Sequence, residues 1–435
     1  MYLQLQPNRP ASAYKVSPLP NLKRKRETDP LPISPNIHRK MYLKALVLYL
    51  LTWMNATAAY QPRNIIEAMQ ANTSGGNRSS IVFQIVGNVY PLGYYKVPIR
   101  IGDSPEPYLL DMDTGSDLTW LQCDTPCHHC SKGPNGTLYK HKGNPVICAE
   151  PVCDRSLQRP ESPCQGPDEQ CDYEVAYTNH GASIGVLVRD SVHLDMTDGA
   201  VVAPQLAFGC GYNKKFHKLN HLNFIVDGVL GLGRGKSSIL TQLASMNVTQ
   251  NIVAHCLNGQ QQGGGNLFLG HYFDPNSNAE IVQTSILSQS NHYYLGWAKL
   301  QYGNRQDTIN IEVSFDSGRT HTYLNSVVYN NLLSNIKEDL KGKQVNVTAG
   351  SNRLPMCWKG GATVTVISYF KPLVLNFFNN NNTEFKMDPE SYLITKKKGN
   401  VCLGIMDGGK VGLNNILPPV HNIRKSWSTK VNVFG

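Results

Sequence analysis

Two short stretches of the chain place an aspartate in a tight turn directly after an apolar run. The first, Tyr108 to Cys123, reads YLLDMDTGSDLTWLQC and contains the motif D-T-G-S, which begins at Asp113. The second reads VSFDSGRT and contains D-S-G, which begins at Asp316. Asp and Gly favour turns whatever their function, so either motif alone is also an ordinary surface turn. Because strand, carboxylate and turn recur together, the sequence favours a duplicated architecture that brings one carboxylate from each half to a shared site.

Two carboxylates that share one proton are suited to hydrolysing a peptide bond without a covalent intermediate. One carboxylate activates a water, and the protonated partner supplies the acid for the leaving nitrogen. Like charges a few ångströms apart do not both ionise readily, so one carboxyl stays protonated. Asp113 and Asp316 are the candidate catalytic pair. A carboxylate pair also serves glycoside hydrolysis, but the twin turn motif is not a feature of that chemistry.

From these residues the chain resembles the pepsin-like aspartic proteases, over about Gly93 to Asn415. The resemblance implies a mostly β, bilobal fold with the active-site cleft between the lobes, a peptide or protein substrate, and neither cofactor nor metal. We also expect a monomer. Because the positive charge gathers in residues 1–40, it does not indicate a nucleic-acid partner, and the apolar run from Ala45 to Trp53 is too short to predict stable membrane insertion. The cysteine-rich insert, together with CWKG at 357–360 and NVCLG at 400–404, resembles the nucellin-like and nepenthesin-type plant members.

The resemblance assigns a flap to the first half of the chain. Trp120 matches the tryptophan that orients the flap tyrosine, and Tyr177 matches that tyrosine, ahead of a hairpin tip around Gly181. In the family the flap covers the cleft and excludes water from the scissile bond. Taken alone, Tyr177 is also compatible with an ordinary half-buried strand tyrosine.

Further residues match positions that support the two active-site loops. Thr114 and Ser317 match the hydroxyls that hold the loops together, and Ser116 matches the hydroxyl that bonds the first aspartate. Gly231 matches the glycine of the apolar crossing behind the first loop. The remaining loop-support positions are the motif glycines, Gly115 and Gly318.

Two features depart from the family pattern. Arg319 stands three residues after Asp316, where the family has Ser or Thr. A cation there favours the ionised form of Asp316 and removes a positioning hydroxyl. After Ile416 the family's apolar-Gly-Asp crossing, closing strands and late cysteine do not follow, and the last residues show neither strand nor helix period. We therefore expect a truncated C-terminal lobe, a second loop without its backing strand, and an odd cysteine, Cys210 or Cys256.

The length of 435 residues predicts two or more core-bearing units. We assign residues 81–283 to an N-terminal catalytic lobe with the cysteine-rich insert, and 284–416 to a C-terminal catalytic lobe. Residues 417–435 form a divergent tail. An apolar period of one helical face predicts a helix from Ser326 to Leu340 in the second lobe.

The first eighty residues read as leader segments. Residues 1–40 carry much of the net charge of +10 and the run KRKR, which we interpret as a disordered basic extension rather than a nuclear import patch. Residues 41–59 combine Lys44, a short apolar run and an A-x-A-like site, as in a secretory signal peptide. An uncleaved signal anchor is the alternative. Residues 60–80 are then a short pro-segment or linker.

The cysteines and the sequons also indicate the secretory pathway. Most of the eleven cysteines fall between residues 123 and 171, a density that indicates disulfides. A zinc site built on Cys123, Cys127 and Cys130 with neighbouring histidines is the alternative. Six sequons predict glycosylation: Asn72, Asn77, Asn135, Asn247, Asn346 and Asn381. We expect a secreted glycoprotein, extracellular or vacuolar.

The leading functional prediction is an aspartic endopeptidase. The alternative is a catalytically impaired pepsin-fold protein that binds proteins or glycans, as inhibitor-like plant members do. Arg319 favours the alternative, whereas the retained aspartates, Trp120 and Tyr177 oppose it. A third possibility is a chain that does not fold stably, because its last strands are missing.

Overall fold

The computed structural model describes residues 80–124, 138–159, 161–177, 181–216, 226–258, 263–270, 285–287, 291–351, 354–361, 363–378, 383–396, 399–411, 420–423 and 432–434. All of them belong to the larger of two compact units, which spans Arg63–Gly435. The predicted extension, signal peptide and nearly all of the pro-segment lie outside the described residues. So do Cys127, Cys130 and the sequons at Asn72, Asn77, Asn135 and Asn381. Within the described part, no helix has the length and apolar character needed to cross a membrane.

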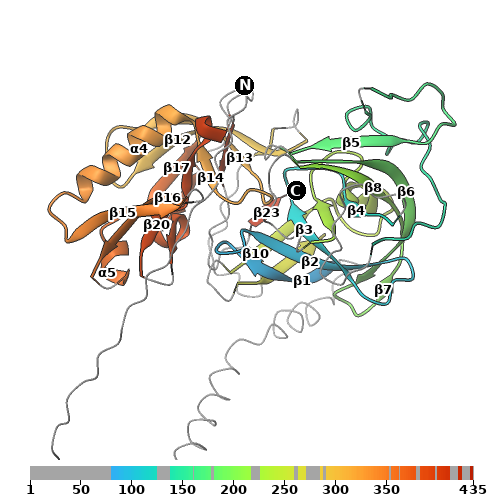
Figure 1. Ribbon diagram of the computed structural model, residues 1–435, viewed down its shortest axis with the longest axis horizontal. Coiled ribbons are helices and arrows are strands. Elements are labelled where there is room, and N and C mark those ends of the chain that lie inside the picture. Colours follow the sequence, from blue (N-terminus) through green and yellow to red (C-terminus); the bar gives the residue numbers. More distant parts are fainter. Residues whose placement is uncertain are drawn as a thin grey trace, which may run out of the picture. The chain divides into compact units, whose positions relative to one another are not determined.

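The first half of the unit is built on one large sheet (Figure 1). Its strands from this half are β1 (Ile81–Asn88), β2 (Tyr94–Ile101), β3 (Tyr108–Asp113), β4 (Trp120–Gln122), β5 (Asp172–Ala176), β6 (Gly181–Asp195), β7 (Val201–Val202), β8 (Gln205–Phe216), β9 (Gly228–Gly231), β10 (Val253–Leu257) and β11 (Gly265–Leu269). The order runs β10-β11-β1-β2-β3-β9-β4-β8-β6-β5, with β7 beside β6. Alternate residues of β2 are buried, as the period of a half-buried strand requires. Helix α3 (Ile239–Ser245) contacts β8.

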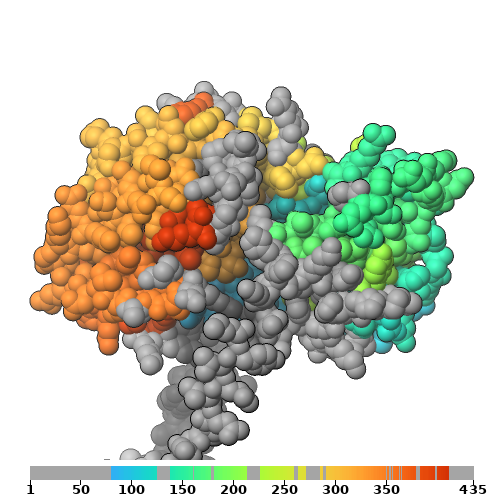
Figure 2. All heavy atoms as spheres, turned by 45° about the horizontal axis from the view of Figure 1, so that its top comes forward, coloured from blue at the N-terminus to red at the C-terminus, as the bar shows by residue number. Residues whose placement is uncertain are grey.

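The second half carries smaller sheets. Its elements are β12 (Tyr293–Tyr302), β13 (Ile309–Phe315), β14 (Thr322–Leu324), α4 (Ser326–Asp339), β15 (Val345–Ser351), β16 (Leu354–Gly360), α5 (Thr363–Ile367), β17 (Leu373–Phe377), β18 (Glu384–Met387), α6 (Pro389–Tyr392), β19 (Leu393–Thr395), β20 (Val401–Leu403), β21 (Ile405–Asp407) and the 3₁₀ turn η1 (Gly408–Val411). Strands β18-β17-β12-β13 form one sheet, β15-β16-β20-β19 another, and β14 pairs with β21. Figure 2 shows side chains of the second half, in orange, at the left of the view and side chains of the first half, in green, at the right.

The helix predicted from residues 326 to 340 is confirmed as α4. The side chain of Asn325 caps its first turn by accepting the Val328 N–H at 2.9 Å. The apolar stripe is buried, as its helical period predicts, with Val328, Leu332 and Ile336 among its members. The buried stripe anchors the helix beside β14 and β21.

Each motif aspartate sits at the end of an inner strand that has a parallel neighbour. Strand β3 pairs with β9, so that Asp113 lies opposite Gly231. Strand β13 pairs in the same parallel sense with β22 (Val420–Ile423), and Phe315, directly before Asp316, lies opposite Ile423. The duplication inferred from the two motifs is therefore matched in the backbone around them.

The expectation that the tail leaves the second loop without a backing strand is wrong. Besides β22, the tail contributes β23 (Asn432–Phe434), which pairs antiparallel with β10. Strand β22 is four residues long and β23 is three. A short strand added to an existing edge is held by backbone hydrogen bonds, which do not require an alternating side-chain pattern. The sequence V-H-N-I therefore carries no strand signal, although it occupies the backing position.

Four disulfides join cysteines of the described residues: Cys123–Cys210, Cys148–Cys164, Cys153–Cys171 and Cys357–Cys402. Because Cys210 pairs with Cys123, Cys210 is not the odd cysteine, and Cys123 is not a zinc ligand. The sulfur atoms of Cys148, Cys153 and Cys164 lie within 4.8 Å of one another. Their disulfides leave no thiolates there for a metal.

Candidate active site

The first loop holds Asp113 through its own turn. Asp113 is 7% exposed at the end of β3. Its Oδ1 accepts the Gly115 N–H at 2.9 Å, and its Oδ2 accepts the Ser116 hydroxyl at 2.6 Å. The predicted contact between Ser116 and the first aspartate is present, and both bonds fix the orientation of the carboxyl.

The second loop repeats this arrangement with one change. Oδ1 of Asp316 accepts the Gly318 N–H at 2.9 Å, as Asp113 does from Gly115. Oδ2 of Asp316 accepts the Arg319 Nε–H at 3.0 Å, within an ion pair of two largely buried side chains. Arg319 thus occupies, in the second loop, the bonding position that Ser116 occupies in the first. The expected cation beside Asp316 is in contact with it.

Reciprocal hydrogen bonds join the two loops. The Thr114 N–H donates to the Ser317 hydroxyl at 2.7 Å, and the Ser317 N–H donates to the Thr114 hydroxyl at 2.8 Å. The Ser317 hydroxyl donates onward to the Met112 carbonyl at 2.9 Å. Each loop therefore fixes the other, which sets the spacing of the two aspartates.

The motif glycines leave room for the opposite carboxyl. A Cβ atom at Gly115 would lie 2.5 Å from Cγ of Asp316, and one at Gly318 would lie 2.4 Å from Oδ1 of Asp113. Both distances are far inside van der Waals contact. Each aspartate thus packs against the glycine of the other motif, and any larger residue would push the two apart.

Burial and the second carboxylate act together on Asp113. They raise its pKa from 3.8 to about 7, with burial as the larger cause and the negative charge of Asp316 as the next. The hydrogen bonds from Ser116 and Gly115 and the charge of Arg319 act in the opposite direction. The pair is therefore arranged to keep a proton on Asp113 through the acidic range.

The glycine crossing predicted behind the first loop is present. The Leu232 N–H donates to the Asp113 carbonyl at 2.8 Å, and the Gly231 N–H donates to the Thr119 hydroxyl at 3.1 Å. A Cβ at Gly231 would come within 2.4 Å of the Asp117 carbonyl oxygen. Only glycine allows the loop and the crossing to approach this closely.

Sequence reasoning missed Asp117, which ties the first loop to the glycine run after β9. Its Oδ1 accepts the Gly235 N–H at 2.8 Å, and its Oδ2 accepts the Asn291 amide at 3.3 Å. A Cβ at Gly233 or Gly235 would lie 2.2 Å from a carboxylate oxygen of Asp117. The repeated glycines of GLGRG were the available signal, because such a run often marks a close backbone approach.

The tyrosine and tryptophan matched to the flap meet in the structure. The Trp120 indole N–H donates to the Tyr177 hydroxyl at 2.6 Å. Tyr177 follows β5, and its N–H donates to the Gly181 carbonyl at 2.7 Å across the base of a hairpin. Burial raises the pKa of Tyr177 well above its ordinary value, and the charge of Asp113 raises it further. Tyr177 is therefore close enough to the first aspartate to be affected by its charge.

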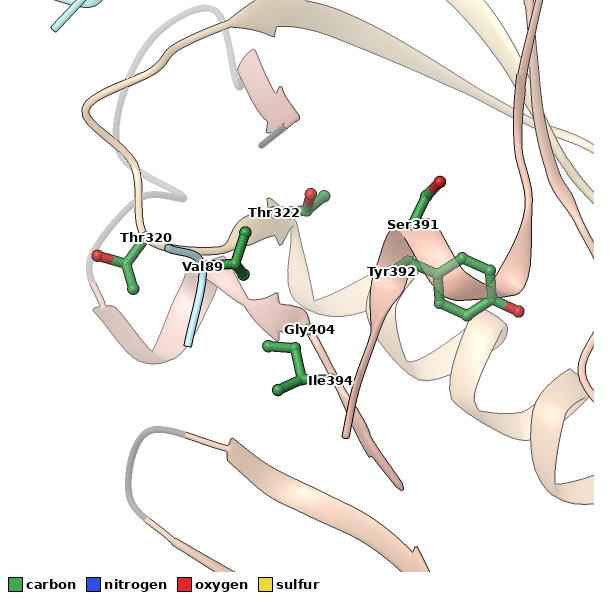
Figure 3. A pocket seen from close by; sticks show the side chains of 7 residues that line it. All are labelled: Val89, Thr320, Thr322, Ser391, Tyr392, Ile394 and Gly404. Atoms are coloured by element: carbon green, nitrogen blue, oxygen red, sulfur yellow. The ribbon is translucent and has the colours of Figure 1, made fainter. Parts of the chain in front are cut away.

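A small pocket lies beside the second loop (Figure 3). It is lined by Val89, Thr320, Thr322, Ser391, Tyr392, Ile394 and Gly404. The Thr320 hydroxyl donates to the Gly93 carbonyl at 3.3 Å, which joins this loop to the turn after β1. The Tyr392 hydroxyl donates to the Lys371 carbonyl at 2.6 Å. The lining holds no carboxylate or imidazole, so the catalytic candidates remain the two aspartates.

Comparisons with known proteins agree with this geometry. Family models described as xylanase inhibitor N-terminal and C-terminal match residues 95–271 and 299–420. An aspartic proteinase of Oryza sativa subsp. indica is 38% identical over 346 residues, which cover 76% of this chain and 82% of that protein. Aspartic proteinase nepenthesin-1 of Nepenthes gracilis is 25% identical, with 72% and 70% covered.

Solved structures show the same fold at low sequence identity. Soybean basic 7S globulin aligns with a TM-score of 0.60 at 16% identity, over 82% of this chain and 92% of that chain. An aspartic proteinase from Irpex lacteus aligns with a TM-score of 0.56 at 15% identity, over 81% and 94%. The predicted mostly β, bilobal pepsin-like fold is confirmed.

The fold and the site together define a class of bilobal proteins, in which each half carries one aspartate at the end of an inner strand. Within that class, the chain belongs to the plant pepsin-like aspartic protease family. Its resemblance to this family, first drawn from the two motifs, is confirmed.

Proposed function

We propose that the protein is an aspartic endopeptidase that hydrolyses peptide bonds with Asp113 and Asp316. The observation that carries this proposal is the pair of loops locked by Thr114 and Ser317, which holds Asp113 and Asp316 close together. The raised pKa of Asp113 supports the same reading. The names of the aspartic proteinase relatives support it. Peptides or proteins are the corresponding substrates.

In this proposal the two carboxyls have different starting roles. Asp113 holds the proton and donates it to the carbonyl oxygen of the scissile bond. Asp316, which accepts hydrogen bonds from Arg319 and Gly318, takes a proton from the attacking water. As the tetrahedral intermediate breaks down, Asp316 passes the proton it has gained to the leaving nitrogen, and Asp113 recovers a proton from a hydroxyl of the intermediate. Tyr177, held by Trp120, closes over the site and limits access of bulk water.

The same proposal includes a secretory location. Four disulfides among the described residues support an oxidising compartment. The predicted signal peptide and sequons point in the same direction. Extracellular space or vacuole is then the site of action, with glycans on some or all of the six sequons.

A pepsin-fold binding protein is the second candidate, because one observation favours it. The Arg319 guanidinium occupies Oδ2 of Asp316, an oxygen that the proposed mechanism offers to water. The family models that match the chain are described as those of xylanase inhibitors. Under this alternative the protein recognises a partner and cleaves nothing.

Peptide cleavage in the presence and absence of pepstatin separates the two candidates. We expect the protein, secreted from a eukaryotic host, to cleave a quenched fluorescent peptide library at acidic pH. Pepstatin should inhibit the cleavage, because it occupies the site between two catalytic aspartates. If the folded protein cleaves no peptide at any acidic pH, the binding-protein alternative holds. If a chelator abolishes activity, the mechanism is a different one.

Replacing Arg319 by serine should move the basic limb of the pH–activity profile upward by roughly one unit. The charge of Arg319 lowers the pKa of Asp113, so without it Asp113 keeps its proton to a higher pH. The profile of kcat/KM against pH for Arg319→Ser and the unchanged protein measures the shift. Arg319→Lys, which retains the charge but not the planar fork, is the matched control and should leave the limb near its original position. An unmoved limb in Arg319→Ser would contradict the charge argument.

A further inference from the structure

The hydroxyl of Tyr293 joins the second half of the molecule to the crossing behind the first aspartate. Tyr293 is the first residue of β12 and is 2% exposed. Its hydroxyl donates to the Leu232 carbonyl at 2.8 Å. The N–H of the same leucine donates to the Asp113 carbonyl at 2.8 Å. A single residue, Leu232, therefore stands between the tyrosine hydroxyl and the backbone of Asp113.

The backbone of the same tyrosine lies beside the strand end that precedes the second aspartate. Tyr293 pairs with Phe315 across the antiparallel strands β12 and β13. Phe315 is the residue directly before Asp316. Tyr293 thus connects the two aspartates by a path that uses neither Thr114 nor Ser317, the residues whose reciprocal bonds lock the loops.

Three further bonds hold the start of β12 and the residues before it against the first half. The Arg234 N–H donates to the Asn291 carbonyl at 2.9 Å, and Nη1 of Arg234 donates to the Leu287 carbonyl at 3.3 Å. The Asn291 amide donates to Oδ2 of Asp117 at 3.3 Å. Burial raises the pKa of Tyr293, with opposing effects from the charges of Arg234 and Asp117. Its hydroxyl therefore keeps its proton and remains a hydrogen-bond donor.

Catalytic groups must be held to within about 0.5 Å of their working geometry by neighbours that do not themselves react. We propose that Tyr293 is a positioning residue of the candidate active site, and that its hydroxyl fixes β12, and through β13 Asp316, against the crossing behind Asp113. This inference rests on the proposed peptidase function, in which the two aspartates act as a pair. Without the hydroxyl the buried Leu232 carbonyl loses its donor, and the two halves are held less firmly at this point.

Tyr293→Phe tests this role, because it keeps the aromatic ring and removes only the hydroxyl. We expect kcat per active site to fall about 10-fold, a part of the roughly 100-fold loss that follows a misplacement of about 1 Å. Titration with pepstatin counts the active sites, so that a smaller folded fraction is not mistaken for slower catalysis. Steady-state cleavage of the fluorescent peptide gives the rate.

The pH–activity profile provides a second readout, which a smaller folded fraction would not change. Asp113 is faced by Asp316, Arg319 and Tyr177. The negative charge of Asp316 raises the pKa of Asp113 more than the charge of Arg319 lowers it. A wider pair therefore holds its proton less strongly, and the basic limb of Tyr293→Phe should move down by about half a pH unit.

Tyr302→Phe is the matched control, because Tyr302 is the last residue of the same strand. Tyr302 is 3% exposed, and its hydroxyl accepts the Lys371 N–H at 3.3 Å within the second half. Both variants should lower the urea midpoint, since each removes a buried hydroxyl from its hydrogen bond. Only Tyr293→Phe should lower kcat per titrated site and move the basic limb.

Amide hydrogen exchange, followed by mass spectrometry, gives a readout that needs no peptidase activity. Peptides that contain the Thr114 and Ser317 amides should exchange faster in Tyr293→Phe than in the unchanged protein, and at the unchanged rate in Tyr302→Phe. Asn291→Ala, a change at an exposed side chain, should have the same effect more weakly and replaces Tyr293→Phe if that variant is not secreted. An inactive unchanged protein would overturn the proposed function, whereas the exchange rates alone report whether the tyrosine fixes the two loops.

Two results would overturn the inference. The first is a kcat per titrated site and a basic limb in Tyr293→Phe that match those of Tyr302→Phe. The second is an unchanged exchange rate at both loops in Tyr293→Phe, because the reciprocal bonds of Thr114 and Ser317 would then hold the loops without the tyrosine.

Discussion

Replacing Asp113 by asparagine should lower kcat by about 10²–10⁴-fold, the usual contribution of a positioned acid or base. Asparagine preserves the shape of the side chain: its amide oxygen can still accept from the Gly115 N–H, and its amide N–H can donate to the Ser116 hydroxyl, but it carries no acidic proton. KM should change little, because the loss concerns the transition state rather than substrate binding. Steady-state cleavage of the fluorescent peptide measures both constants.

A matched control is Asp198→Asn. Asp198 is exposed and accepts the Ala200 N–H at 3.0 Å in a surface turn. This variant should retain full activity, because Asp198 lies in a surface turn that is distant in sequence from both motifs, and its carboxylate bonds within that turn. Full activity in Asp113→Asn would mean that the observed cleavage comes from another group or from a contaminating protease.

The Asp113→Asn variant also tests the raised pKa of Asp113, without an activity assay. Between 3.8 and about 7 the folded state keeps a proton that the unfolded state releases. The free energy of unfolding therefore falls as pH rises from 3.8 to about 7. Below this range the carboxyl is protonated in both states and adds no pH dependence. Urea unfolding as a function of pH should show a shallower fall for Asp113→Asn than for the unchanged protein. The activity of the unchanged protein should likewise fall as pH rises through about 7.

The motif residues could be predicted from sequence because their chemistry is local. Asp113 and Ser116 are bonded within one turn, and this contact was predicted from the family resemblance. The partnership of Thr114 with Ser317 crosses the whole chain. It followed only from the family resemblance, and no propensity or period points to it. Trp120 and Tyr177 were likewise predicted by resemblance, and their hydrogen bond has no local signature.

Contacts that depend on how closely two backbone segments approach each other could not be predicted from the sequence. Asp117 is the carboxylate around which the glycines at 233 and 235 pass, yet a carboxylate after a turn motif looks like a solvated residue. The sequence showed that Arg319 departs from the family pattern. Only the structure showed that Arg319 bonds Asp316 in the way that Ser116 bonds Asp113 in the first loop. Strand β22 was missed because edge pairing depends on backbone groups, which are the same for every sequence without proline.

Ending the chain after Ile416 should destabilise the protein and lower its peptidase activity by about 100-fold. The deletion removes β22, which pairs with four residues of β13 immediately before Asp316. It also removes β23, which pairs with Val253, Ala254 and His255 of β10. Each backbone hydrogen bond contributes about 1 kcal/mol net. A misplacement of about 1 Å in a catalytic group costs about 100-fold in rate.

Two single substitutions separate the contributions of the tail strands. Proline removes a backbone donor and disrupts a ladder, so Asn422→Pro should weaken β22 and Val433→Pro should weaken β23. Because β22 lies directly beside the strand that carries Asp316, Asn422→Pro should lower kcat and the urea midpoint together. Val433→Pro should lower only the midpoint, since β10 carries neither aspartate. Active-site titration with a tight inhibitor gives the fraction of competent molecules and so distinguishes a loosened loop from an unfolded chain. If the shortened chain cleaves peptide as fast and unfolds at the same urea concentration as the full chain, β22 does not support the second aspartate, and the loop must be held by β13 and β14 alone.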